Sequence, residues 1–127
     1  MAIFPSCKKF IAQQEQKAVI NAVTNGYWYV EGYHQNDSDQ TAAFSGYLFK
    51  FNQNNTVVGT LNSLSDTGSW VADIGARTIM ANFPGAGDPL KKLNRTWKIK
   101  DSYTNYVVAN FTDTVNNSID TLQLRKQ

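Results

Sequence analysis

The chain has 127 residues, of which 42% are hydrophobic and 13% aromatic, so it is long enough for one domain with its own core. Its net charge of +2 is too small for a general nucleic-acid binder, and no apolar run approaches the roughly 18 to 20 residues of a membrane-spanning helix. Cys7 is the single cysteine, which excludes a disulfide within the chain.

Residues 1–25 are expected to form an N-terminal tether and a helix. Apolar side chains recur at helical spacing up to Val23, and Gly26 can end the helix in a left-handed conformation. Small and apolar residues precede Cys7, as they do at the end of a lipoprotein signal peptide, where the cysteine receives lipid. Two interpretations of Cys7 stay open: a lipid attachment site in the native protein, or an ordinary free cysteine in a flexible N-terminus.

From residue 26 to residue 127 the hydrophobic period changes from 3.6 to 2, which is typical of β-strands. Eight strands are predicted, over residues 27–33, 45–51, 56–61, 68–72, 77–83, 96–101, 106–112 and 119–125. Most connections are short and polar, so sequential neighbours should pair antiparallel. Because closure removes exposed sheet edges, the fold class predicted is all-β with an N-terminal helix, an eight-stranded antiparallel up-and-down β-barrel.

Alternation along the strands sorts the side chains into two faces. The face predicted to point inward contains Trp28, Val30, Tyr47, Phe49, Phe51, Val57, Leu61, Trp70, Ile79, Phe83, Trp97, Ile99, Leu122 and Leu124. For the strand 106–112 the pattern does not decide which of its two faces is the inner one. Tyr27, Tyr29 and Tyr33 are predicted on the outer face, either packed against the helix or forming a strip that binds a partner.

Few residues favour catalysis, so no enzyme activity, cofactor or metal site is predicted. His34 is the only histidine and is expected at the surface. Asp37 and Asp39 could contact Ca²⁺, but they lack the glycine and the distal glutamate of a calcium loop. The basic residues of segment 91–100 are expected to be solvated, with an anionic partner as the alternative.

Two Gly-x-Trp triplets, Gly26-Tyr27-Trp28 and Gly68-Ser69-Trp70, mark the starts of strands. Together with the segments 44–52, 56–57, 93–99 and 120–124, they resemble the lipocalin-like domains of small bacterial lipoproteins, which have calycin-type barrels. The resemblance implies that Trp28 closes the base of the barrel and that a basic residue packs across it. Arg125 is the expected residue, with Lys126 as its substitute. It also implies a lipid-anchored protein of the bacterial periplasm or outer membrane.

The function expected is non-catalytic binding of a small apolar or amphipathic ligand at the bacterial cell envelope. The walls of the ligand site would be Tyr47, Phe49, Trp70, Ile79, Phe83 and Trp97, with segment 84–95 as the lid. The alternative is a filled barrel that acts as a protein-interaction or accessory module of the envelope. That module would use the outer tyrosines or the basic segment 91–100.

Overall fold

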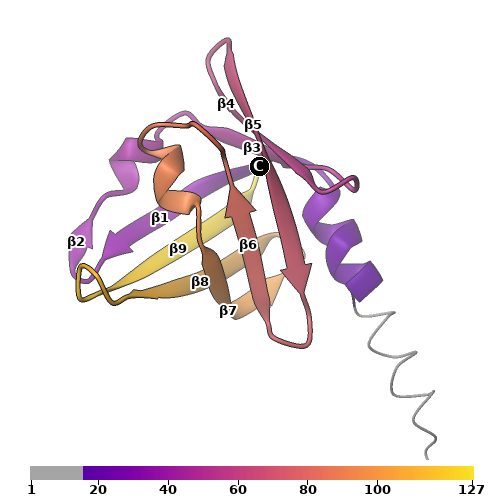
Figure 1. Cartoon of the computed structure of the whole chain (residues 1–127). Helices are drawn as coiled ribbons and strands as arrows, with labels where there is room; N and C mark the ends of the chain where they lie inside the picture. The colour runs from indigo at the N-terminus through magenta and orange to yellow at the C-terminus, as the bar shows by residue number, and fades with distance from the viewer. Residues whose placement is uncertain (1–15) are drawn as a thin grey trace, which may run out of the picture.

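The computed structural model describes residues 16–127, and its main feature is one antiparallel sheet closed into a barrel (Figure 1). Residues 16–24 are helical and lie at one end of the barrel. The strands are β1 (Trp28–Gln35), β2 (Ser38–Asp39), β3 (Leu48–Phe51), β4 (Thr56–Leu61), β5 (Leu64–Asp73), β6 (Thr78–Asn82), β7 (Thr96–Tyr103), β8 (Tyr106–Asp113) and β9 (Ser118–Lys126). Two short 3₁₀ helices, η1 (Thr41–Phe44) and η2 (Leu90–Leu93), lie between strands.

The barrel closes because β1 pairs with β9, from Trp28 opposite Lys126 to Gln35 opposite Asp120. Strands β3 to β9 follow one another as an antiparallel meander, and β1 contacts β3 in register at a single pair, Trp28 and Phe49. The two-residue strand β2 pairs only with the end of β1, so the other eight strands form the barrel, and the predicted eight-stranded antiparallel barrel with an N-terminal helix is confirmed. The strand predicted over 45–51 begins only at Leu48, because a turn with Gly46 at φ 84° follows η1 and occupies residues 45–47.

Asparagine and glycine supply the backbone conformations that this meander needs. Asn36, Asn55, Asn62 and Asn117 all have φ between 51° and 67° at turns, a region that asparagine tolerates better than most residues. At Gly68 a side chain is excluded, because a Cβ there would overlap the carbonyl oxygen of Asn82 on the neighbouring strand. The second Gly-x-Trp triplet therefore has its glycine at a close approach of β5 and β6.

The alternation predicts most of the interior correctly. The predicted residues that are buried in the core are Trp28, Val30, Phe49, Phe51, Val57, Trp70, Phe83, Trp97 and Leu122. Those that pack against this core while half-buried are Tyr47, Ile79, Ile99 and Leu124. In β8 the inner face consists of Val107, Ala109 and Phe111. Leu61 was predicted inside but lies outside the core, at the end of β4, where the β4–β5 hairpin extends beyond β6.

The prediction that Tyr27, Tyr29 and Tyr33 share the outer face of the barrel is wrong, because β1 contains a bulge. The register of β1 against β9 shifts between Val30 and Gly32, so Glu31 is an extra residue and the alternation changes phase after it. Tyr33 is therefore turned into the barrel, where it is fully buried. Tyr27 is half-exposed before the start of β1, so the two residues do not share a surface.

Candidate functional site

The barrel interior is filled with aromatic rings, including most of the predicted ligand-site walls. Phe49, Trp70, Phe83 and Trp97 are each no more than 2% exposed, whereas Tyr47 and Ile79 are half-buried. Phe49 packs on the rings of Tyr47 and Phe83, with centroids 5.9 and 6.3 Å apart. These three rings therefore pack against one another inside the barrel.

Among the residues that the structure describes, the barrel core lines cavities of about 30 Å³ and about 40 Å³. Both are lined by apolar side chains, and they share the walls Phe51, Ile79, Leu122 and Leu124. Of the predicted ligand-site residues, Phe49, Ile79, Phe83 and Trp97 line a cavity, while Tyr47 and Trp70 line neither. Since a water molecule needs at least about 10 to 15 Å³, each cavity has room for only a few atoms.

The base of the barrel is closed by Trp28, as the resemblance implied. The basic residue that covers its ring is Lys126, whose Nζ lies 5.1 Å from the ring centroid. The expectation that Arg125 covers Trp28 is wrong, since Arg125 lies over Tyr106 at 4.5 Å and pairs with Glu31. Strand alternation explains the difference, because Lys126 is in register with inward-facing Trp28, whereas Arg125 is not.

At the same end of the barrel, side chains of the strands donate hydrogen bonds to the last carbonyl groups of the helical residues 16–24. Lys126 Nζ donates to the carbonyl oxygen of Ala22 at 2.8 Å, and Trp28 Nε1 donates to that of Val23 at 2.9 Å. Lys50 Nζ donates to the carbonyl of Thr24. The last carbonyls of a helix have no partner within the helix, and its C-terminus attracts cations. The barrel therefore supplies the cap of this helix, and Gly26 ends it at φ 82°, as predicted.

The opposite end of the barrel, its mouth, is covered by the two 3₁₀ helices. Phe44 of η1 and Leu90 and Leu93 of η2 are all buried, at 2%, 1% and 6% exposure. The segment 84–95 thus packs over the mouth, and its apolar side chains are part of the core. Asn94 fixes its end, because the side-chain amide bonds both the backbone N–H and the carbonyl of Phe83, at 2.6 and 3.2 Å.

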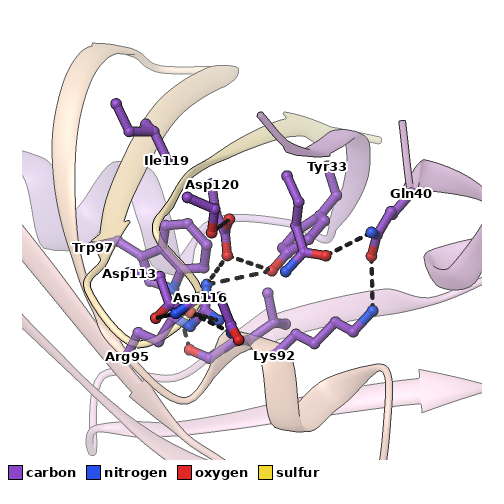
Figure 2. A network of polar contacts seen from close by, with 12 residues as sticks. Tyr33, Gln40, Lys92, Arg95, Trp97, Asp113, Asn116, Ile119 and Asp120 are labelled. Atoms are coloured by element: carbon purple, nitrogen blue, oxygen red, sulfur yellow. Dashed lines mark hydrogen bonds and ion pairs between the residues drawn. The ribbon is translucent and has the colours of Figure 1, made fainter. Parts of the chain in front are cut away.

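A buried polar group lies beside this cover, and we call it the mouth cluster: Tyr33, Arg95, Asp113, Ser118 and Asp120 (Figure 2). The guanidinium of Arg95 pairs with Asp120 and lies 3.5 Å from Asp113. The carboxylate of Asp120 also accepts from the hydroxyls of Ser118, at 3.0 Å, and Tyr33, at 3.4 Å. The cluster connects segment 84–95, which ends at Arg95, to β1, β8 and β9.

Burial and hydrogen bonding set the ionisation of two members of the mouth cluster. Burial raises the pKa of Tyr33 to about 12. The backbone N–H and side-chain amide of Asn116 donate to Asp113 and hold the pKa of its carboxyl below the usual 3.8. No buried side-chain nitrogen or oxygen between residues 16 and 127 lacks a hydrogen-bond partner. The fully buried polar atoms of the mouth cluster are therefore all hydrogen-bonded within the protein.

The remaining predicted sites are dispersed. In segment 91–100, Lys91, Lys98 and Lys100 are exposed, Lys92 donates to Gln40, and Arg95 is paired with Asp120 of the mouth cluster. His34 lies 3.9 Å from Asp39.

The carboxylate of Asp39 accepts from the backbone and hydroxyl of Thr41, which lowers its pKa. Within residues 16–127 no group of three metal-ligating side chains is present, and no helix is long and apolar enough to cross a membrane. Cys7 lies outside the described residues.

Sequence reasoning missed the mouth cluster, although one signal pointed to it. Asp120 stands two residues before Leu122 and four before Leu124, so it has the same parity as two residues predicted to point inward. An aspartate on the inner face of a strand requires a buried partner. Arg95, from the segment interpreted as solvated, is that partner.

Comparison with known proteins supports the barrel fold. The structure resembles the crystal structure of a DUF4847 family protein from Bacteroides vulgatus ATCC 8482, with a TM-score of 0.61 and 17% sequence identity. The match covers 86% of this chain and 99% of that one. No family model matches the sequence, and no curated protein matches it. At this level of identity the similarity shows a shared barrel fold.

Proposed function

We propose that this protein is a non-catalytic binding protein with a filled barrel, and that it binds another protein on its outer surface. The observation that carries the proposal is the size of the interior space, about 30 and about 40 Å³ in two cavities. For comparison, an engineered apolar cavity that binds benzene has a volume of about 150 Å³. A lipid-like guest would have to displace side chains such as Phe49 and Leu122 that form the core.

Both ends of the barrel support the same proposal. At the base, the helical residues 16–24 and Trp28 are tied together by hydrogen bonds. At the mouth, Leu90 and Leu93 are buried in the core, and Arg95 is paired with carboxylates of β8 and β9. A carrier of an amphipathic ligand needs an entrance and a polar group that can bind the ligand head. Here Leu90 and Leu93 cover the entrance, and the buried polar groups beside it are bonded to one another.

The competing proposal is a carrier of a small apolar ligand, with Phe49, Ile79, Phe83 and Trp97 as walls. Its support is that the two cavities share walls and are lined by apolar side chains. In either case we propose a location at the cell envelope, which is what the resemblance to lipocalin-like domains of bacterial lipoproteins implies. That location, with Cys7 as the lipid attachment site, stays a prediction.

A titration with an apolar fluorescent probe, N-phenyl-1-naphthylamine, distinguishes the two proposals. The filled barrel predicts no saturable fluorescence increase with the native protein, and no rise in Tm with benzene. Phe49→Ala and Leu122→Ala each enlarge the cavity of about 40 Å³, so benzene should raise the Tm of these variants. Saturable probe binding by the native protein, weakened in both variants, would establish the carrier instead.

A further inference from the structure

The β4–β5 hairpin carries a strand edge that no other strand covers. β5 pairs with β4 along Leu64 to Ser69, but its pairing with β6 begins only at Ser69. The first part of β5 therefore projects beyond the barrel wall as half of a two-stranded ribbon (Figure 1). We call residues 65–67 the hairpin edge, and all three of them are exposed.

The turn of the hairpin determines which backbone groups point outward. Leu61 and Leu64 are paired across a two-residue turn, so they exchange both of their backbone hydrogen bonds. Hydrogen-bonded pairs alternate along an antiparallel ladder, so Asp66 also bonds β4. Ser65 and Thr67 then direct their N–H and C=O groups away from β4. Among residues 16–127 none of these four groups has a hydrogen-bond partner.

Charge indicates what kind of strand fits the hairpin edge. Asp66 lies between the two outward-directed residues, is exposed, and has no ion pair with any described residue. A strand added to this edge would place one residue directly opposite Asp66, on the same face. Opposite charges at such positions are favourable and like charges are unfavourable, so a lysine or arginine fits best.

The same charge disfavours a second copy of this chain as the occupant. Two hairpin edges can satisfy all four outward groups of each chain only with Ser65 opposite Thr67 of the other copy. That register places the two Asp66 side chains directly opposite one another, as like charges. An inward-pointing charge on an exposed edge is a known protection against self-association.

We propose that the hairpin edge binds an extended segment of a partner protein as an added β-strand, with a lysine or arginine of that segment opposite Asp66. This inference rests on the proposed function, and it names the surface and the chemistry of the partner. Backbone hydrogen bonds to Ser65 and Thr67 provide the affinity, and Asp66 provides the selectivity.

The test uses the full chain and two capped heptapeptides of alternating threonine and valine, one with lysine and one with glutamate at the centre. Amide hydrogen exchange at Ser65 and Thr67 is followed by NMR. Both amides should exchange more slowly as the lysine peptide is added, in proportion to the bound fraction. The Kd for the lysine peptide should be about two- to fivefold lower than that for the glutamate peptide.

Matched variants distinguish a loss of peptide binding at the hairpin edge from a loss of stability. Thr67→Pro removes a backbone N–H that donates to no described residue. Peptide binding should therefore be lost, while the Tm changes little. Thr67→Val keeps the N–H and should bind like the native protein. Asp66→Lys should reverse the preference, so that the glutamate peptide binds more tightly.

Two results would overturn the proposal. One is unchanged exchange at Ser65 and Thr67 with saturating lysine peptide. The other is protection of these amides that depends on protein concentration without peptide, which would show a second copy at the edge. The naphthylamine titration of the interior is independent, so failure of the edge does not imply failure of the filled barrel.

Discussion

Removal of the Asp120 carboxylate should destabilise the protein strongly. Asp120 is fully buried, and the Arg95 side chain with which it pairs is 16% exposed. In Asp120→Ala the guanidinium stays buried without its closest carboxylate, a change that typically costs about 3 to 5 kcal/mol. Arg95 keeps Asp113 at 3.5 Å and the ring of Phe111 at 4.6 Å, so we expect the lower end, about 3 kcal/mol.

Urea unfolding followed by tryptophan fluorescence measures this loss. A chain of this length loses roughly 4 °C of Tm per kcal/mol, so the Tm should fall by about 12 °C. Asp66→Ala is the matched control, because Asp66 is exposed, and its free energy of unfolding should change by less than about 0.5 kcal/mol. The double variant Arg95→Met/Asp120→Leu should recover much of the loss, since it leaves no buried charge.

The reasoning is refuted if Asp120→Ala loses no more stability than the control. It is also refuted if the double variant is as unstable as the sum of its two single variants, because the cost would then not come from an unpaired charge.

Three further predictions concern backbone packing and ionisation. Gly68→Ala should lower the free energy of unfolding by about 1 to 3 kcal/mol, because the added Cβ overlaps the Asn82 carbonyl. Gly87→Ala is the control, since the space around Gly87 is open. Equal melting temperatures for the two variants would contradict this prediction. Burial raises the pKa of Tyr33 from 10.0 to about 12, so its contribution is complete below pH 10 and declines as the pH approaches 12. Between pH 10 and 12, urea titrations should therefore show a smaller fall in the free energy of unfolding for Tyr33→Phe than for the native protein. An equal fall in the two proteins would show that Tyr33 is not the group that titrates. The pKa of Asp113 lies below 3.8, so its contribution is present above that pH and is lost as the pH falls through the folded-state value. Asp113→Asn should show a shallower decline in stability between about pH 5 and 3, and an equally steep acid transition would count against it.

The strands could be predicted from the sequence because each has its own period-two pattern and its own polar turn. Inward residues such as Phe49, Trp70 and Leu122 follow directly from that alternation. The pattern fails where the backbone inserts a residue, since nothing in the local sequence distinguishes the bulged Glu31 from an ordinary outward residue. The inward position of Tyr33 is a consequence of that insertion.

The covers of the barrel mouth were less predictable for a different reason. Phe44, Leu90 and Leu93 lie in connections, and no periodicity indicates that a connection folds back onto the core. Arg95 looked like one of several solvated basic residues, because its partners Asp113 and Asp120 are about 20 residues away in sequence. Only the parity of Asp120 with Leu122 and Leu124 links the candidate site to the sequence.

The closure of the barrel constrains when the protein can finish folding during its synthesis. β1 has one register pair with β3, the next long strand in sequence, but it pairs along its whole length with β9. Until β9 leaves the ribosome, β1 has only short pairings, with β2 and β3, and Val30 has no paired strand beside it. Such distant pairings slow folding. The barrel is therefore expected to close only after β9 has been synthesised, so a chain that ends before Ser118 should keep β1 without its main partner.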